Sequence, residues 1–202
     1  MNFASNAIHW LLTHYLEIIA VATGLLYILF TIREKTLLWL FGIISSAIYI
    51  WIFYKSKIFA YSLLYIYYVI IGFYGWYNWA GKKEGSGNNS LLIRHTPVKW
   101  LAGCIVSTVL IAIPVYFILI RFTDSDMALL DAVLTSGGMV ATWMLTQKFV
   151  EQWLFWIILN ALSLSAMLYK SLYPSAVLFL VYDVLAVKGF FDWKKEIQTR
   201  NK

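Results

Sequence analysis

Charged residues are scarce in this chain of 202 residues. Only 13% of them are Asp, Glu, Lys or Arg, whereas 61% are hydrophobic, and the mean hydropathy is +0.72. A water-soluble domain has about a quarter of its residues charged, so this chain has too little polar surface to cover a soluble globule. The composition therefore excludes a soluble protein and predicts an integral membrane protein that lies in the lipid bilayer.

Cysteine, clustered histidine and the common catalytic motifs are missing as well. The single Cys104 excludes an intramolecular disulfide, and His9, His14 and His95 are too scattered to form a metal site with it. There is no phosphate-binding GxxxxGK[ST] loop, no GxSxG or HExxH motif and no pair of intramembrane carboxylates. We therefore expect neither an enzyme nor an ATP-driven pump, and no metal or other cofactor.

A cleaved leader and a nucleic-acid partner are not expected either. The first 16 residues contain no Lys or Arg, and no small-residue cleavage site follows them. The net charge of +6 would suggest nucleic acid in a soluble chain. Membrane proteins, however, carry an excess of Lys and Arg on their cytoplasmic side, and this bias explains the charge better.

Long hydrophobic segments fill most of the chain. A helix needs roughly 20 apolar residues to cross the hydrocarbon core, with a range of about 17 to 25. Residues 1–16 are too short to span and are expected at the membrane interface or as an extension of the first helix. Seven segments qualify as spans, at approximately 17–32, 37–54, 58–79, 98–120, 131–146, 152–169 and 172–193. The sequence therefore predicts an all-α protein with seven transmembrane helices.

The positions of Lys and Arg predict how these helices are oriented. With the N-terminus outside, twelve of the 16 cations fall on the cytoplasmic side and four fall outside. Because cytoplasmic loops carry the excess, we expect the N-terminus outside and the C-terminus in the cytoplasm. Residues 80–97, which include the polar stretch GKKEGSGNNS, are then a cytoplasmic linker, and residues 194–202 are a cytoplasmic tail.

The sequence also contains an internal repeat. Tyr54-Lys55-Ser56 recurs as Tyr169-Lys170-Ser171, and GFYGWYNW (72–79) matches AVKGFFDW (186–193). One residue is lost after the Tyr-Lys-Ser turn, and Tyr68 then falls opposite Tyr182; before the turn, Phe41 falls opposite Trp156, and Ser45 opposite Asn160.

Each repeat comprises three helices, in residues 17–79 and 131–193, and one unmatched helix (98–120) joins them. Three spans and a linker helix bring the second repeat back to the starting side, so the two repeats are parallel. Repeats of this kind place a binding site between the halves near the bilayer midplane, which favours a transporter. Duplication for stability alone is the alternative interpretation.

One face of the segment EQWLFWIILN (151–160) concentrates the candidate ligand contacts. Trp153, Trp156 and Asn160 are spaced i, i+3 and i+7, which places them on one side of a helix. An amide inside a membrane is costly without a partner, and indole faces attract cations and stack on flat rings. The segment predicts the wall of a pocket for a flat, polar molecule. Interfacial tryptophans with a helix-packing asparagine are the alternative.

Further candidates lie near the middle of their spans. Ser45, Tyr68, Tyr182 and Asp183 are predicted at a matching depth. Tyr68 belongs to a stripe with Tyr61 and Tyr65 that serves either as a permeation lining or as helix packing. Asp183 is the only carboxylate clearly within the bilayer, where such a group is a functional hypothesis by default. It would pair with a cationic substrate or a proton, or contact Lys188 instead.

Two motifs give the chain a family resemblance. WLFWIILN (153–160), with Glu151 before it, and YGWYNW (74–79) resemble the PnuC-type vitamin transporters, which are bacterial carriers best known for nicotinamide riboside. The WxxWxxxN/D pattern of that family matches at Trp153, Trp156 and Asn160. The YGWxxW ending of the third span adds Trp76 to the candidates. The resemblance extends from about residue 17 to residue 193.

The resemblance implies a function and an assembly. The family imports its vitamin by facilitated diffusion, and a cytoplasmic kinase traps the product as a phosphate. It also implies a homotrimer in the bacterial plasma membrane and a fold like a full-length relative of the SWEET sugar transporters. Trp153 and Trp156 would then flank the aromatic ring of the vitamin, and Asn160 would hydrogen-bond to its carboxamide or ribose.

Other functions stay open at this point. Close relatives carry thiamine or riboflavin, and thiamine shares a fixed positive ring nitrogen with nicotinamide riboside. Asn160 favours nicotinamide riboside, whereas Asp183 lies outside the family pattern and is compatible with another cation. A membrane scaffold without a ligand and an intramembrane enzyme or electron carrier are the remaining classes.

Overall fold

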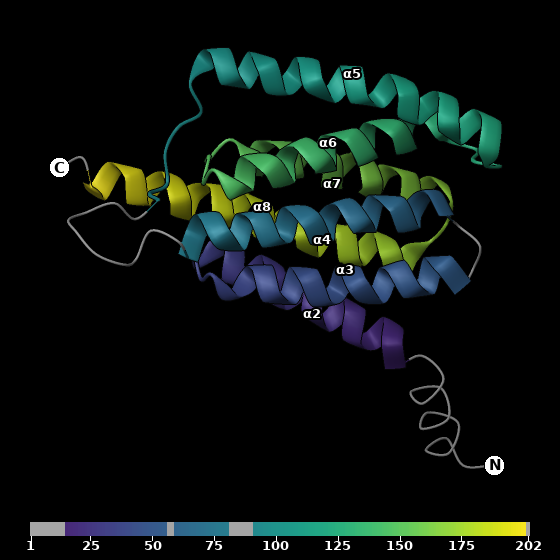
Figure 1. Cartoon of the computed structure of the whole chain (residues 1–202), viewed down its shortest axis with the longest axis horizontal. Helices are drawn as coiled ribbons and strands as arrows, with labels where there is room; N and C mark the ends of the chain where they lie inside the picture. The colour runs from purple at the N-terminus through teal and green to yellow at the C-terminus, as the bar shows by residue number, and fades with distance from the viewer. Residues whose placement is uncertain (1–14, 56–58, 81–90, 201–202) are drawn as a thin grey trace. The chain divides into compact units, whose positions relative to one another are not determined.

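The structure, a computed structural model, describes residues 15–55, 59–80 and 91–200. Most of the predicted interfacial segment and of the polar linker lies outside these residues. The described part contains seven α-helices (Figure 1): α2 (Tyr15–Ile32), α3 (Leu37–Lys55), α4 (Phe59–Ala80), α5 (Val98–Phe122), α6 (Ala128–Thr146), α7 (Gln152–Tyr169) and α8 (Tyr173–Arg200). Each predicted span coincides with one helix, which confirms the all-α fold.

Four of these helices, α3, α5, α6 and α7, are long and apolar enough to cross a membrane. A shorter apolar stretch, Ala22–Ile32, lies within α2. The last helix, α8, continues to Arg200, so residues 194–200 of the predicted tail are its last turns. In this extension, KKEIQTR (194–200), Ile197 is buried and the Arg200 guanidinium donates a hydrogen bond to the carbonyl of Ile93.

The chain divides into two compact units, residues 1–76 and 77–202. In the first unit, α3 contacts both of its neighbours. The rings of Phe30 in α2 and Phe41 in α3 stack with centroids 5.3 Å apart. The rings of Tyr49 in α3 and Tyr65 in α4 are 4.9 Å apart. The first unit is therefore a bundle of three helices with α3 as the shared element.

The second unit contains α5 to α8 and the last residues of α4. α5 packs on α6, α6 on α7, and α7 on α8 (Figure 1). The indole N–H of Trp79, at the end of α4, donates a hydrogen bond to the carbonyl of Thr146 (3.3 Å). The ammonium of Lys148 lies 4.5 Å from the centre of the Trp79 ring. These contacts fix the end of α4 to the end of α6.

A tryptophan packed on a glycine recurs in both units. In the first, Trp39 of α3 covers Gly75 of α4, where an added Cβ would lie 2.3 Å from the indole. In the second, Trp153 of α7 covers Gly189 of α8, where the same distance is 2.6 Å. Both indoles are 1% exposed. Trp153 and Gly189 follow Trp39 and Gly75 at the same separation along the chain, so the internal repeat is also a repeat of packing.

The first helix of each repeat ends in the same way. Glu34 and Lys148 have positive φ angles of 51° and 54°, which is the left-handed conformation. Their N–H groups donate to the carbonyls of Thr31 (3.1 Å) and Leu145 (2.9 Å). The next residue in each case donates to the carbonyl five positions before it, which completes a Schellman cap. The first helices of the two repeats, α2 and α6, therefore share this cap, which α7 also has at Ser171 (φ 57°).

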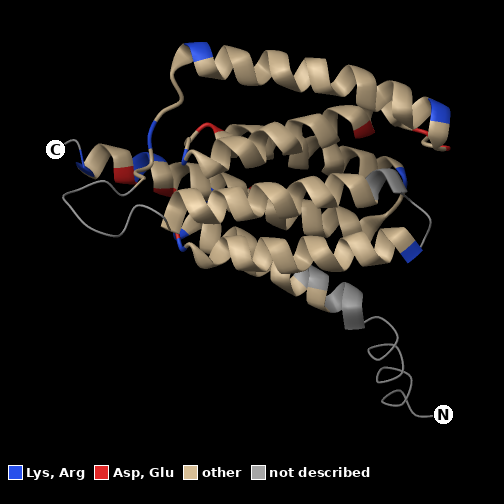
Figure 2. Cartoon of the chain, in the orientation of Figure 1, with Lys and Arg blue, Asp and Glu red and all other residues tan. Residues whose placement is uncertain are grey.

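Cations gather at one end of the second unit (Figure 2). Lys99 lies at the start of α5, Lys148 just after α6, and Lys194, Lys195 and Arg200 in the last turns of α8. The opposite end carries Arg121, in the last turn of α5, and Lys170, just after α7. This asymmetry is the one that the sequence predicts for a cytoplasmic end.

Candidate functional site

The three predicted wall residues of α7 have different surroundings. Trp153 is buried, and its ring meets that of Trp193 edge-on at 5.6 Å and 86°. Together with its position over Gly189, this contact makes Trp153 part of the α7–α8 core, whereas the alternative interpretation of the sequence placed it at the membrane interface. Trp156 is partly buried, and Asn160 is buried with 6% exposure. The polar part of the predicted wall is therefore Asn160, with Trp156 one turn away.

The Trp153–Gly189 contact fixes which residues of α7 and α8 lie at the same height. The two helices are antiparallel and joined by a short turn, and each rises about 1.5 Å per residue. Seven residues along α7 and seven residues back along α8 therefore reach a common level, about 10 Å from the tryptophan. These positions are Asn160 and Tyr182, and Asp183 follows directly. We call Asn160, Tyr182 and Asp183 the polar level of the second unit.

The first unit has a similar level. Counting seven residues from Trp39 and back from Gly75 pairs Ser46 with Tyr68, and the Tyr49–Tyr65 contact fits the same register. Ser45 and Ser46 are both buried. The helix packing thus pairs Ser46 with Tyr68, one residue from the predicted Ser45.

Tyr68 and Trp76 differ in their surroundings. The ring of Tyr68 meets those of Tyr65 and Tyr67 edge-on, each at 5.6 Å, so the predicted tyrosine stripe is a packed cluster at this point. Trp76 is 37% exposed and lies at the level of Trp39, about 12 Å along α4 from Tyr68. It belongs to the end of the first unit, away from the level of Tyr68.

Asp183 lies on the buried side of α8. It is seven residues after Ala176 and three before Ala186, which are 3% and 0% exposed, so the three share one helix face. Its Oδ1 atom is buried and has no hydrogen-bond partner among the described residues. The alternative partner Lys188 instead contacts Asp192, with 2.6 Å between Nζ and Oδ2.

Gln152, the first residue of α7, is a buried group that the sequence interpretation missed. It is fully buried, and neither its amide nitrogen nor its amide oxygen has a partner in the described part of the chain. It precedes Trp156 by four residues and therefore shares its face. The spacing of Gln152, Trp156 and Asn160 was the available signal, but a polar residue at a helix start is normally interpreted as interfacial.

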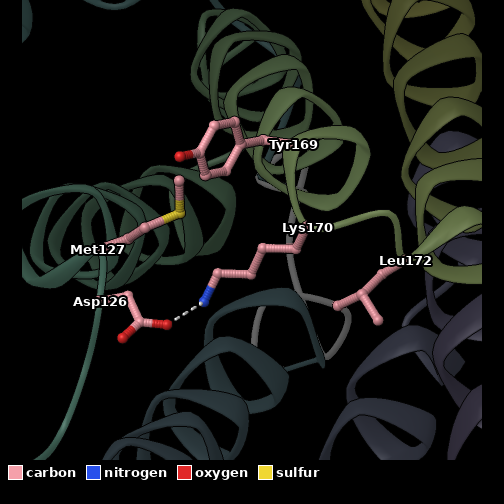
Figure 3. A pocket seen from close by; sticks show the side chains of 5 residues that line it. All are labelled: Asp126, Met127, Tyr169, Lys170 and Leu172. Carbon is pink, nitrogen blue, oxygen red and sulfur yellow. Dashed lines mark hydrogen bonds and ion pairs between the residues drawn. The ribbon is translucent and has the colours of Figure 1, made fainter.

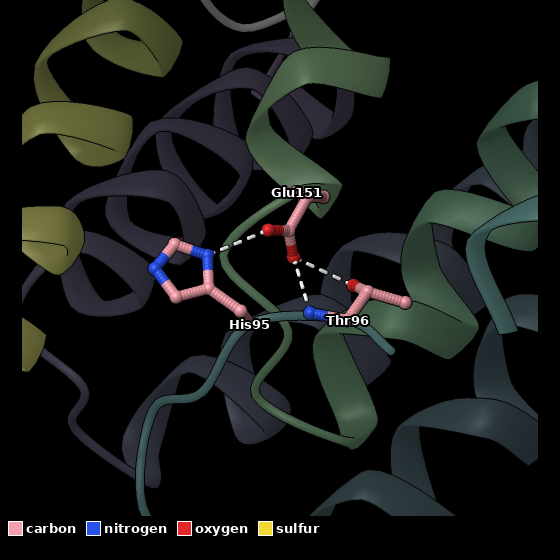
Figure 4. Close-up of polar contacts among 3 residues, drawn as sticks. All are labelled: His95, Thr96 and Glu151. Carbon is pink, nitrogen blue, oxygen red and sulfur yellow. Dashed lines mark hydrogen bonds and ion pairs between the residues drawn. The ribbon is translucent and has the colours of Figure 1, made fainter. Parts of the chain in front are cut away.

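Glu151 ties the start of α7 to the segment before α5 (Figure 4). The Nδ1–H of His95 donates to one carboxylate oxygen (2.8 Å). The N–H and hydroxyl of Thr96 donate to the other, at 2.7 and 2.6 Å. Arg94 extends this junction with backbone hydrogen bonds to Lys148 and Val150. The candidate wall helix is therefore anchored at its first turn.

The pKa of Glu151 reflects these contacts. Burial by itself raises it, but the hydrogen bonds from Thr96 and His95 outweigh burial and lower the pKa below its ordinary value of 4.5. The ionised carboxylate therefore contributes stability that is complete above pH 4.5 and is lost as the pH falls through the lowered pKa.

We expect Glu151→Gln to lower the stability of the protein at pH 7 by about 1 kcal/mol, the usual net value of a hydrogen bond. The deficit should shrink as the pH falls below the pKa of Glu151, because the wild-type carboxylate is then protonated too. Thermal unfolding in detergent, at pH 7 and at a pH below the pKa of Glu151, measures the difference in stability between the wild type and the variant. Asp126→Asn is the control, because Asp126 is 83% exposed in its ion pair with Lys170. Equal deficits at both pH values would contradict the assignment.

A hollow opens at the opposite end of the second unit (Figure 3). It is lined by Asp126, Met127, Tyr169, Lys170 and Leu172, which come from the α5–α6 and α7–α8 connections. Lys170 and Asp126 form an exposed ion pair of 3.4 Å across it. Tyr169 lies about 13 Å along α7 from Asn160, so this hollow is separate from the polar level.

The sequence matches a known family over nearly its full length. The sequence model of the family described as nicotinamide mononucleotide transporter matches residues 14–195. A curated relative from Escherichia coli (strain K12), the nicotinamide riboside transporter PnuC, is 26% identical over 92% of this chain and 87% of its own length. The protein of the same name from Neisseria mucosa is 24% identical, over 97% of this chain and 76% of its own.

A solved structure has the same fold. It is described as the crystal structure of the vitamin B3 transporter PnuC, and it superposes with a TM-score of 0.74 over 96% of this chain and 87% of its own. The two sequences are 22% identical, so the likeness establishes a common arrangement of helices.

Proposed function

We propose that this chain, which belongs to the nicotinamide mononucleotide transporter family, imports nicotinamide riboside by facilitated diffusion. Membership of the family makes it a multi-pass membrane transporter and not an enzyme. The observation that carries the proposal is the buried amide of Asn160 at the level of Tyr182, one helical turn from Trp156. A flat ring with a carboxamide requires an aromatic face and a group that both donates and accepts hydrogen bonds. The indole supplies the first and the asparagine amide the second.

The proposed contacts divide into binding and support. Trp156 stacks on the pyridinium ring, and Asn160 hydrogen-bonds to the carboxamide or the ribose. Tyr182 supplies a further polar edge. Trp153, packed on Gly189, holds α7 and α8 in register so that these groups stay level. In the first unit, Ser45, Tyr68 and Trp76 stay predicted substrate contacts.

The charge around the polar level favours the riboside over its phosphorylated form. A phosphate is normally bound by Lys or Arg, yet α7 contains neither residue, and α8 contains neither before Lys188. The charged group at this level is instead the carboxyl of Asp183, which would repel a phosphate. Nicotinamide mononucleotide is therefore the less suitable ligand.

Facilitated diffusion agrees with the absence of an ATP-binding motif from the sequence. Import by this route requires only a binding site that is reached from each side in turn, and a cytoplasmic kinase keeps the internal concentration low by phosphorylating the riboside. The cations at the end of the second unit that contains Lys99 and Lys148 support a cytoplasmic location of that end. We accordingly propose the N-terminus outside, the C-terminus in the cytoplasm of a bacterium, and a homotrimer in the plasma membrane.

A ligand panel tests the proposed substrate. Purified protein should bind nicotinamide riboside in a calorimetric titration at least tenfold more tightly than thiamine, riboflavin or nicotinamide mononucleotide. Tight binding of thiamine alone would replace the substrate by the second candidate, which the carboxyl of Asp183 also suits. No heat with any of the four compounds would contradict both of these substrates.

A further inference from the structure

Resting on the proposed function, we infer that Asp183 is the residue by which this site distinguishes a ligand with a fixed positive charge from a neutral ligand of the same shape. Asp183 would recognise the charge of the ligand, whereas Trp156 and Asn160 would recognise its shape and its hydrogen-bonding groups. The starting point is Oδ1 of Asp183, which is buried and has no hydrogen-bond partner in the part of the chain that the structure describes.

The position of Asp183 along α8 brings it to the height of the candidate site. It shares the buried face of α8 with Ala176 and Ala186, and α8 packs against α7. The register set by Trp153 and Gly189 brings Asp183 to within one residue of the level of Asn160. Its carboxyl group therefore lies at the height at which the amide of Asn160 would hold the ligand.

The chemistry of Asp183 requires a partner that the described residues do not provide. Its Oδ1 is buried without a hydrogen bond among the described residues, although the residue as a whole is half-buried, and a carboxylate oxygen that is removed from water without a partner is unfavourable. The nearest cation along α8, Lys188, is paired with Asp192 at 2.6 Å. α7 and the preceding part of α8 contain no Lys or Arg. A cation carried by the ligand is the partner that satisfies this group.

The pyridinium of nicotinamide riboside has the required charge. Opposite charges within about 4–6 Å favour each other's ionised forms, and the π-face of Trp156 favours a cation as well. Reduction of the ring by a hydride gives the 1,4-dihydro riboside, which is neutral and keeps the carboxamide and the ribose. The two compounds therefore differ mainly in the positive charge of the ring, which is the property that the carboxyl group of Asp183 would recognise.

The experiment compares these two ligands in calorimetric titrations of the wild type, Asp183→Asn and Asp192→Asn. The wild type should bind the pyridinium form at least tenfold more tightly than the dihydro form. Asp183→Asn should lose at least tenfold in affinity for the pyridinium form and change less than about threefold for the dihydro form. Asp192→Asn removes an exposed carboxylate of the same helix and should preserve the wild-type ratio.

Three results overturn the inference. Equal losses for both ligands in Asp183→Asn would make Asp183 a structural or hydrogen-bonding group, and no loss would place it outside the site. A wild type that binds both forms equally excludes charge recognition even if the variant does not fold. These results leave the proposed function intact, because the wild type still binds the riboside. A wild type that binds neither form contradicts the proposed function itself.

Discussion

Asn160→Ala should weaken the binding of nicotinamide riboside by at least tenfold while the protein still folds. Asn160 is 6% exposed and is level with Tyr182 at the middle of the α7–α8 pair. A site built to hydrogen-bond a polar ligand loses that bond and leaves the partner group on the ligand unsatisfied when the amide is removed. A tenfold loss corresponds to about 1.4 kcal/mol, which is within the range for one such contact. Calorimetric titration of the purified variant measures it.

The matched control is Ser165→Ala on the same helix. Ser165 is exposed, and its hydroxyl donates to the carbonyl of Ala161 in its own helix (2.9 Å), so its removal should leave the affinity within about twofold of the wild type. A thermal transition like that of the wild type shows that Asn160→Ala is folded. Unchanged affinity in a folded Asn160→Ala protein would remove Asn160 from the site.

Replacement of Gly75 or Gly189 by alanine should destabilise the protein by about 1–3 kcal/mol, the usual cost of overpacking. The added Cβ would lie 2.3 Å from the indole of Trp39 in the first case and 2.6 Å from that of Trp153 in the second. Neither indole can move away easily, because both are 1% exposed. Replacement by leucine should prevent folding. The thermal transition in detergent and the monodisperse fraction on size exclusion measure both effects.

Gly103→Ala is the control, because an added Cβ there has no neighbour within 4 Å. Gly103 lies inside α5, where alanine has the higher helix propensity, so this variant should be unchanged or stabilised by up to about 1 kcal/mol. The same glycine-to-alanine substitution should therefore lower the stability at positions 75 and 189 and leave it unchanged or raise it at position 103. If Gly75→Ala and Gly189→Ala are as stable as Gly103→Ala, the tryptophan–glycine contacts do not stabilise the helix packing within each unit.

The helices could be predicted from the sequence because the membrane imposes a length on each hydrophobic segment. The segment predicted at 37–54 is α3 (Leu37–Lys55), and the one predicted at 152–169 is α7 (Gln152–Tyr169). Hydropathy reports only the apolar part of a helix, so the extension of α8 to Arg200 was not visible. Residues 194–200 remain helical, with Ile197 buried and the Arg200 guanidinium donating a hydrogen bond to the carbonyl of Ile93.

The surroundings of the site residues could be predicted only in part. The spacing of Trp153, Trp156 and Asn160 gives a common face of one helix but not the helix that covers it. The glycine that receives Trp153 lies in α8, so only the packing shows that this indole belongs to the core. The repeat contained that information, because Trp39 and Gly75 precede Trp153 and Gly189 at one constant separation.

The residue that falls opposite Asn160 in the first repeat depends on where the count starts. Counted from the Tyr-Lys-Ser turns it is Ser45, whereas the helix packing is set by Trp39 and Trp153. The interval from tryptophan to turn is one residue longer in α7 than in α3. Ser46, and not Ser45, therefore lies at the position that corresponds to Asn160 when the count starts from the tryptophans.

The most direct test of the proposed function is counterflow of nicotinamide riboside in liposomes that contain the purified protein. Vesicles loaded with unlabelled riboside and diluted into labelled riboside should accumulate label transiently, without ATP, an ion gradient or a membrane potential. The same vesicles with Asn160→Ala should accumulate much less. Absence of counterflow with the folded wild type, or accumulation only when a proton or sodium gradient is imposed, would contradict facilitated diffusion of nicotinamide riboside.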